Sequence, residues 1–273
     1  LHKAIRRQRQ MCIRDRYHGL GNDFVLTRYM EDIDMPKLVQ SCCDRHTGIG
    51  ADGMIFVKED SLEMVYYNQD GSRAPMCGNG IRCFAAYCFD EGINTEEVIP
   101  VSTLAGEKIV HRISTSPFEV CVDMEQPIYD NRLIDVSEDE NVWKREVCGV
   151  DTYSLFMATT HTVVFVDDAF SEKNVELGRR ICHDPLFKKQ TNVNFIQVID
   201  DTHITVMTYE RGCGITLACG TGACASVVVA NKLGFVQSEC EVQLKLGSLK
   251  IEVKDHVYMT GPAKKICEGE FVC

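Results

Sequence analysis

The chain contains the same short pattern twice, and each copy precedes a predicted helix. Cys77 opens the run C-G-N-G and Cys219 opens C-G-T-G, and a tyrosine lies ten residues before each cysteine, at Tyr67 and Tyr209. Two matches in the same register indicate an internal duplication rather than chance. The repeat therefore predicts two similar domains, each of which places one cysteine at a helix N-terminus.

The helices that follow the cysteines end at glycines. They are expected over about residues 80–91 and 222–233, and Gly92 and Gly234 lie just past them, where glycine commonly ends a helix. The second helix is apolar on nearly every side, so it has to be buried all round. Strands wrapped around a central helix would bury it in this way.

A third spacing fits the duplication. His18 precedes Cys77 by 59 residues, and His161 precedes Cys219 by 58. We therefore predict an α+β fold of two pseudo-symmetric domains, each a mixed or antiparallel, barrel-like sheet around a central helix. A predicted helix also follows each C-G-x-G run. If the two halves are duplicated, the two histidines are expected to be equivalent positions.

The predicted domains cover residues 17–125 and 126–262, with residues 263–273 completing the first and the seam near Pro127. Short runs rich in Val, Ile, Phe and Tyr predict many strands, and Gly247-Ser248 indicates a hairpin turn near the end of the chain. Further helices are expected over residues 36–43 and 171–182. Strands are expected over residues 24–29, 54–57, 63–67, 108–113, 119–123, 162–166, 194–199, 203–209, 241–246 and 249–254.

Residues 1–16 differ from the rest of the chain. They carry six basic residues against the single acidic Asp15 and begin with Leu1. They contain no serine and no apolar face, although a transit peptide would have both. We interpret them as a non-native basic leader and exclude them from the functional argument.

Composition limits the possible partners. Without the first sixteen residues the chain has 23 basic and 39 acidic residues, a formal charge of about −16, which argues against nucleic acid or an anionic membrane as a partner. No run reaches the ~18 apolar residues of a membrane helix. A small amino acid is the expected partner, a homodimer is left open, and the cytoplasm is the expected location.

The chain has fifteen cysteines but no C-x-x-C spacing, so the usual zinc and redox motifs are absent. Most of the cysteines are expected to be small buried residues in a reducing compartment. That interpretation applies to Cys42, Cys43, Cys88, Cys121, Cys148, Cys182 and Cys240.

Cys77 and Cys219 have a different environment. A helix N-terminus carries partial positive charge and unpaired N–H groups, so it lowers the pKa of a thiol and can bind a carboxylate. Gly78-Asn79 and Gly220-Thr221 are therefore expected to hold an α-carboxylate. One thiolate could remove an α-proton while a thiol on the opposite face returns one. Such stereoinversion requires two matched cysteines, whereas a cysteine hydrolase requires one.

Five motifs resemble those of the diaminopimelate epimerases, over almost all of residues 17–273. They begin at His18 (H-G-L-G-N-D-F), Tyr67 (Y-N-Q-D-G), Cys77 (C-G-N-G-I-R-C), Glu210 (E-R-G) and Ala218 (A-C-G-T-G-A). The resemblance implies conversion of LL- to meso-diaminopimelate without pyridoxal phosphate, any other cofactor, or metal, as a late step of lysine and cell-wall precursor synthesis.

The resemblance also implies a role for each matching residue. Cys77 corresponds to the proton donor and Cys219 to the proton acceptor in the LL-to-meso direction, and His161 to a residue that tunes the thiols. The residues that match the substrate-binding set are Asn22, Asn68, Gly78, Asn79, Asn192, Glu210, Arg211, Gly220 and Thr221.

Two departures from the family pattern concern the substrate. Thr159-Thr160-His161 stands where the family usually has Asn-Pro-His, so Thr159 replaces an amide that contacts the distal end of the substrate. Ile215 stands where the family often has glutamate. A racemase of another amino acid, such as histidine or a diaminopimelate analogue, is therefore the alternative. A cysteine hydrolase or transpeptidase and a non-catalytic amino-acid-binding protein are the remaining hypotheses.

Overall fold

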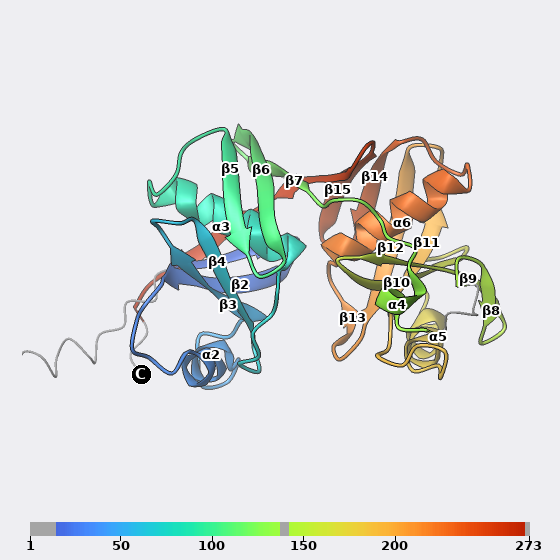
Figure 1. The fold of residues 1–273 in the computed structure, drawn as a ribbon, viewed down its shortest axis with the longest axis horizontal. Coiled ribbons are helices and arrows are strands. Elements are labelled where there is room, and N and C mark those ends of the chain that lie inside the picture. Colours follow the sequence, from blue (N-terminus) through green and yellow to red (C-terminus); the bar gives the residue numbers. More distant parts are fainter. Residues whose placement is uncertain (1–14, 137–141, 271–273) are drawn as a thin grey trace, which may run out of the picture. The chain divides into compact units, whose positions relative to one another are not determined.

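The computed structural model describes residues 15–136 and 142–270, which form two compact units. One unit ends at Val122 and resumes at Pro262, and the other runs from Asp123 to Gly261 (Figure 1). The C-terminal strand therefore belongs to the same unit as the N-terminal half. The sequence placed these divisions after residues 125 and 262.

The first unit is a mixed sheet with two helices. β1 and β2 form an antiparallel hairpin, β2 and β3 are parallel with α2 between them, and β3 pairs antiparallel with β4. After α3, β5 pairs in parallel with β4 and starts an antiparallel meander, while β17 closes against β1. The elements are β1 (Asp15–Gly19), β2 (Asn22–Arg28), α2 (Met35–Cys43), β3 (Gly53–Lys58), β4 (Glu63–Asn68), α3 (Gly78–Asp90), β5 (Val98–Thr103), β6 (Gly106–Thr115), β7 (Phe118–Asp123) and β17 (Lys264–Glu268).

The second unit repeats this order. β9 and β10 are antiparallel, β10 and β11 are parallel with α5 between them, β11 pairs with β12, and α6 leads to β14, which lies parallel to β12. The elements are α4 (Asn131–Ile134), β8 (Arg145–Val147), β9 (Val150–Met157), β10 (Thr159–Phe165), α5 (Lys173–Cys182), β11 (Asn192–Val198), β12 (His203–Glu210), β13 (Gly214–Thr216), α6 (Gly220–Lys232), β14 (Glu239–Leu244), β15 (Gly247–Val253) and β16 (Val257–Pro262).

The helices α3 and α6 are the centres of the two units. Every residue of α3 from Gly78 to Cys88 is buried, and α6 is buried from Gly222 to Ala230. Strands of its own unit pack against each helix, as Figure 1 shows for both. The predicted α+β fold, with a mixed sheet wrapped around a central helix in each half, is confirmed.

The helix ends were also predicted correctly. Gly92 and Gly234 have φ values of 67° and 77°, the left-handed conformation that glycine adopts readily after the last helical turn. Both helices begin two residues earlier than expected, because the glycines after each cysteine are already helical.

Several expectations were wrong in detail. The late hairpin turns at Lys245-Leu246, because Leu244 pairs with Gly247 and β15 already begins there. Residues 1–14 of the expected leader lie outside the described residues, but Asp15 and Arg16 belong to β1, where Arg16 pairs with Asp23.

Two cysteines expected to be buried are only partly so, and several strands escaped prediction. Cys121 lies on β7 and Cys148 beside a turn, and both are half-buried. The unpredicted strands include β9, β16 and β17. β9 and β17 lack the regular alternation of buried and exposed residues that the sequence rule requires, whereas β16 alternates but ends in Gly261-Pro262, residues that usually mark turns.

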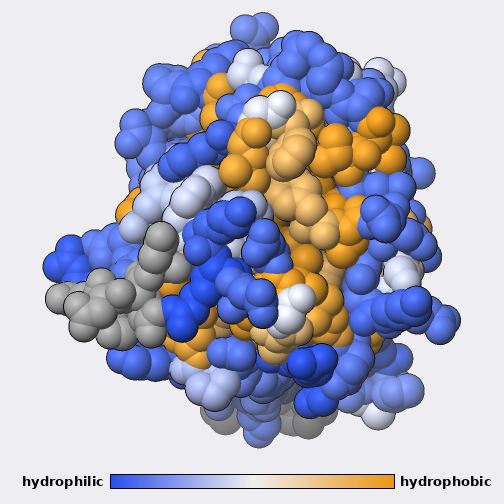
Figure 2. Space-filling view, turned by 90° about the vertical axis from the view of Figure 1, so that its right-hand side faces the viewer, coloured by the Kyte–Doolittle hydropathy of each residue, from blue (hydrophilic) through white to orange (hydrophobic). Residues whose placement is uncertain are grey.

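One face of the second unit collects exposed apolar side chains (Figure 2). Aromatic rings from Tyr129 through Trp143, Tyr153 and Phe165 to Phe235 contact one another in succession. Lys232 Nζ lies 3.9 Å from the ring centroid of Tyr129. In the described part of the chain, no helix has the length and apolar character needed to cross a membrane.

Arg82 offers a test of how the first unit is held together. Its fully buried side chain donates from Nε to the carbonyl of Pro262 (3.1 Å) and from Nη1 to that of Gly78 (3.2 Å). We expect Arg82→Ala to lower the free energy of unfolding by about 2–4 kcal/mol, because the buried carbonyls lose their donor.

Urea denaturation measures this loss, and Arg28→Ala is the control. Arg28 forms an exposed ion pair with Glu59, so its removal should cost less than about 1 kcal/mol. Equal, small effects of the two substitutions would show that the bond from Arg82 to the Pro262 carbonyl does not stabilise the first unit.

Candidate active site

Cys77 is the N-cap residue of α3. Its backbone is extended, its sulfur accepts a hydrogen bond from the Gly80 N–H (Sγ–N 3.4 Å), and its side chain is half-buried. The sulfur therefore lies at the positive end of the helix dipole. Gly78 and Asn79 are the first two helical residues, so their N–H groups have no partner within the helix.

An oriented amide lies beside the Cys77 sulfur. The thiol donates to Asn22 Oδ1 at 3.8 Å, and Asn79 Nδ2 donates to the same oxygen at 3.0 Å. Asn22 Nδ2 in turn donates to Asp52 Oδ2 at 2.7 Å. Since Asp52 can only accept, this bond turns the amide oxygen of Asn22 toward the thiol.

Asp52 is itself held in place. Arg45 Nη2 donates to Asp52 Oδ1 and to Asp23 Oδ1, both at 2.8 Å. The guanidinium groups of Arg45 and Arg16 hold the pKa of the Asp23 carboxyl below its usual value, although burial acts in the opposite direction. Neither Asp52 nor Arg45 was predicted from the sequence. The only sequence feature that could have indicated them is the polar loop between α2 and β3, which contains both residues.

Cys219 is the N-cap residue of α6 and is buried. Its sulfur lies 3.5 Å from the hydroxyl of Thr221, the second residue of the helix. Gly220 and Thr221 thus occupy the same helical positions as Gly78 and Asn79. The two cysteines share their backbone setting but differ in the polar groups around the sulfur.

A chain of hydrogen bonds within the second unit begins at Cys219. His161 Nε2 lies 3.0 Å from Thr221 Oγ1, and His161 Nδ1 lies 3.1 Å from Asn194 Nδ2. Thr208 Oγ1 donates to Asn194 Oδ1 at 3.0 Å. We call Thr208, Asn194, His161 and Thr221 the Cys219 relay. Asn194 and Thr208 were missed in the sequence, where they are two of several polar residues within the predicted strands.

His161 is fully buried in this relay. Burial lowers the pKa of His161 to about 3, and the charge of Arg211 acts in the same direction. The imidazole is therefore neutral at physiological pH. A neutral imidazole has one donor and one acceptor nitrogen.

The predicted binding residues of the second unit lie together. Asn192 pairs with His161 across β10 and β11, and its Oδ1 accepts from the backbone N–H of Arg211 at 3.0 Å. Glu210 ends β12 and accepts from Thr216 Oγ1 at 2.6 Å. The exposed guanidinium of Arg211 donates to the carbonyl of Lys189.

Two further predicted residues are less closely tied to a sulfur. Asn68 ends β4, accepts from Tyr66 Oη (2.8 Å) and donates to Ser72 Oγ (3.0 Å). Thr159 begins β10, and among the described residues its buried Oγ1 has no hydrogen-bond partner. Ile215 lies in β13 opposite Tyr209 and is 40% exposed.

The pairing of His18 with His161 was wrong. With Tyr67 and Tyr209 as equivalent positions, strand register places Phe24 where the second unit has His161. His18 lies on β1, where its Nδ1 accepts from the Gly21 N–H. Equal spacing from the cysteines did not identify equivalent residues, because the loops of the two halves differ in length.

The same register makes Ile55 of the first unit equivalent to Asn194 of the second, and Tyr66 equivalent to Thr208. The glycines at the third helical position agree with the equivalence of Ile55 and Asn194. A Cβ on Gly80 would meet Met64, Ile55 and Cys77, whereas one on Gly222 would meet the Asn194, Thr208 and Cys219 side chains. The helix start is thus backed by apolar groups in one unit and by polar groups in the other.

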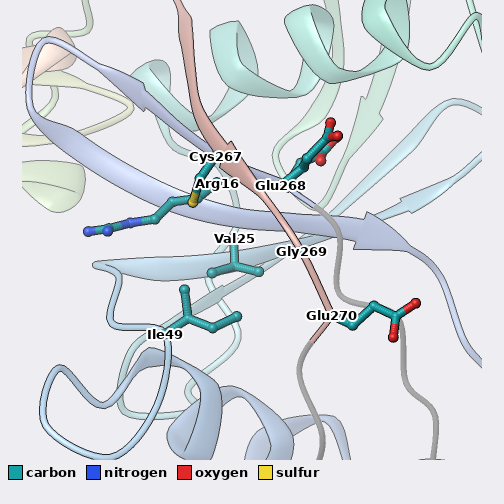
Figure 3. Close-up of a pocket in the computed structure, with 8 residues that line it drawn as sticks. Arg16, Val25, Ile49, Cys267, Glu268, Gly269 and Glu270 are labelled. Carbon is teal, nitrogen blue, oxygen red and sulfur yellow. The ribbon is translucent and has the colours of Figure 1, made fainter.

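A small pocket elsewhere in the first unit contains none of the predicted site residues. It is bordered by β1, β2 and β17, and Figure 3 shows Val25 and Ile49 on one side and Cys267 on another. Across residues 15–136 and 142–270, no three His, Cys, Asp or Glu side chains are grouped so that they could hold a metal ion.

The sequence matches a known family over both halves. The family described as "Diaminopimelate epimerase" matches residues 16–129 and 153–266. The chain belongs to the diaminopimelate epimerase family. Each matched segment spans one N-cap cysteine, its central helix and the strands around it, so the match follows the internal duplication.

Two members of this family resemble the chain over most of its length. The diaminopimelate epimerase of Archaeoglobus fulgidus is 42% identical and covers 92% of this chain and 93% of its own length. That of Alkaliphilus metalliredigens is 39% identical, with 93% and 95% covered.

Solved structures share the fold at low sequence identity. A Bacillus anthracis phenazine biosynthesis protein of the PhzF family superposes with a TM-score of 0.69 at 13% identity, covering 95% of this chain and 98% of that one. A hydroxyproline epimerase from Agrobacterium vitis gives 0.65 at 13%, covering 96% and 92%.

The close packing behind Cys219 predicts a difference between two glycines. A Cβ on Gly222 would lie 2.4 Å from Asn194 Oδ1, whereas the nearest atom to a Cβ on Gly80 is the flexible end of Met64 at 3.1 Å. We expect Gly222→Ala to cost about 2–3 kcal/mol of unfolding free energy and Gly80→Ala about 1 kcal/mol or less. Urea denaturation of both variants measures the difference, and the reverse order would contradict the packing.

The low pKa of His161 predicts how stability depends on pH. The unfolded histidine, with its pKa near 6.5, takes up a proton that the folded one refuses until pH about 3. Stability from the neutral form is complete above pH 6.5 and is lost as pH falls toward 3, by about 1.4 kcal/mol per unit.

The measurement compares the wild type with His161→Gln at pH 7.5 and 5.5, since the other histidines cancel in the difference. The free energy of unfolding of the wild type, relative to the variant, should fall by about 1.4 kcal/mol at the lower pH. An unchanged difference would mean that His161 titrates normally.

Proposed function

We propose that the chain is an isomerase that interconverts LL- and meso-diaminopimelate, with one cysteine removing the α-proton and a second cysteine delivering a proton to the opposite face. Family membership supports the substrate. One observation carries the mechanism: equivalent helix starts place Cys77 and Cys219 at their N-caps with different hydrogen-bonding partners. The Cys77 sulfur accepts from the Gly80 N–H and its thiol donates to the oxygen of Asn22, whereas the Cys219 sulfur lies against the hydroxyl of Thr221.

In the LL-to-meso direction, the Cys219 thiolate removes the α-proton and becomes a thiol. The electron pair of the broken C–H bond stays on the α-carbon and its carboxylate. The Cys77 thiol then protonates the opposite face and becomes a thiolate, which inverts the centre. An acceptor beside Cys77 favours the S–H form, and a donor beside Cys219 favours the thiolate.

The helix starts provide the electrostatic part of the reaction. The N–H groups of Gly78, Asn79, Gly220 and Thr221 bind the α-carboxylate of the inverted centre. Negative charge grows on that carboxylate as the proton leaves, and the helix dipoles stabilise it. No cofactor is needed in this mechanism, because the electron sink is the substrate carboxylate itself.

The remaining predicted residues would bind the other groups of the substrate. Arg211 offers a fork for a carboxylate and Glu210 a partner for an ammonium group. Asn22, Asn68 and Asn192 supply amides for the remaining hydrogen bonds. This set suits a substrate that is zwitterionic at both ends.

We propose the cytoplasm as the location and lysine and cell-wall precursor synthesis as the pathway. Both cysteines have to stay reduced for proton transfer, which a reducing compartment ensures. A homodimer stays a prediction, as do the absence of nucleic-acid and membrane partners.

The alternative is the same reaction on a different amino acid. Thr159 supports it, because a short hydroxyl stands where the family usually has an amide, and Ile215 on β13 stands where the family often has a charged glutamate. We expect inversion of LL-diaminopimelate and none of L-histidine under the same conditions. Thr159→Asn should lower KM for diaminopimelate several-fold with little change in kcat, because it restores an amide donor. Inversion of L-histidine but not of LL-diaminopimelate by the wild type would assign the chain to the alternative.

Replacing the cysteines tests the two-base mechanism. Cys77→Ala and Cys219→Ala should each lower the rate of inversion at least 10³-fold, because both faces of the carbon need a proton carrier. Cys121→Ala, at a half-buried cysteine of β7, is the control and should retain activity. Chiral chromatography of the product measures the rate. If Cys219→Ala stayed active while Cys77→Ala did not, a single-nucleophile hydrolase would be the better description.

A further inference from the structure

The Cys219 relay contains more polar groups than proton transfer alone requires. Asn194 is fully buried and Thr208 is 2% exposed, and buried apolar side chains, among them Phe195, Ile196 and Val206, lie beside them on the same strands. Burying such groups costs free energy unless each is hydrogen-bonded. The first unit solves the same packing problem with Phe24, Ile55 and Tyr66.

The relay has a direction, which can be followed from its inner end. The Thr208 hydroxyl donates to the Asn194 carbonyl oxygen, so the amide nitrogen of Asn194 faces His161 Nδ1. An amide nitrogen only donates, so Nδ1 has to be the acceptor nitrogen. The single proton of the neutral ring is then on Nε2.

The outer end follows from this proton. His161 Nε2–H donates to the oxygen of Thr221, 3.0 Å away. The Thr221 hydroxyl then directs its own proton elsewhere, and the Cys219 sulfur lies 3.5 Å from it. A hydroxyl proton held toward the sulfur stabilises the thiolate over the thiol.

The charged group that bears on His161 is Arg211, and it opposes protonation of the ring, as burial does. His161 is therefore held as a neutral donor and does not act as a general base toward Cys219. A base would need its unprotonated nitrogen on the side of the sulfur, and that nitrogen faces Asn194 instead.

We propose that Asn194 is a positioning residue that fixes the tautomer of His161, so that Thr221 donates its hydroxyl proton to Cys219. This inference rests on the proposed function only for its catalytic meaning. The hydrogen-bond direction and the reactivity of Cys219 can be measured without any substrate.

The first experiment determines the tautomer by ¹⁵N NMR of labelled histidine in the full-length protein. We expect the His161 signals to show a proton on Nε2 and none on Nδ1, with no change between pH 6 and 8. Asn194→Asp has nearly the same shape but only accepts, so the proton should move to Nδ1. A wild-type proton on Nδ1 would overturn the proposal.

The second experiment measures the reactivity of Cys219 through the pH dependence of its alkylation by iodoacetamide, followed by peptide mass spectrometry. Thr221→Val should raise the pH midpoint by about one unit, which is about tenfold slower alkylation at neutral pH. Thr221→Ser keeps the hydroxyl and should behave as the wild type. Asn194→Asp should shift the midpoint in the same direction as Thr221→Val.

Cys77 is the internal control in every sample, because its neighbours Asn22 and Gly80 belong to the other unit. Its alkylation midpoint should not move in any of these variants. An unchanged Cys219 midpoint in Thr221→Val would overturn the proposal even if the enzyme inverts diaminopimelate. Conversely, a shifted midpoint in a chain that inverts no amino acid would leave the relay intact and refute the proposed function.

Discussion

The structure depends on a helix start that is buried inside a sheet and capped by a cysteine. A buried helix N-terminus leaves N–H groups that need a partner, and a strand-wrapped helix such as α3 or α6 has few neighbours that could provide one. Small residues after each cysteine keep the approach to these groups open. The same constraint that shapes the core therefore creates a site for an anion next to a thiol, and the chain builds it twice.

Duplication supplied two matching sites, and divergence made them chemically different. The register of the strands equates Phe24 with His161 and Ile55 with Asn194. An apolar backing leaves Cys77 to its contact with the Asn22 oxygen, whereas a polar backing brings a hydroxyl to Cys219. The proposed two-base reaction starts from one thiol and one thiolate, and this divergence would assign the thiol form to Cys77 and the thiolate form to Cys219.

The sequence predicted the features that repeat and missed those that differ. Periodicity, the glycine stops and the C-G-x-G runs located both central helices and both N-cap cysteines. Sequence spacing failed for His18, because loop lengths shift the count while strand register does not. Asn194 and Thr208 could not be found, since a buried polar residue in a strand is recognised only from the partner that the fold brings to it. Asp52 was missed because its role depends on Asn22, which lies 30 residues away in the sequence.

The central claim is that one thiolate of the chain removes the α-proton and a second, solvent-exchanged thiol replaces it on the opposite face, without a cofactor. Incubation of the purified protein with LL-diaminopimelate in D₂O, followed by mass spectrometry and NMR of the meso product, tests it most directly. The account predicts one deuterium per product molecule, at the inverted carbon alone, with no cofactor added. Product that retains its original α-proton at the inverted carbon, or no product at all, would contradict it.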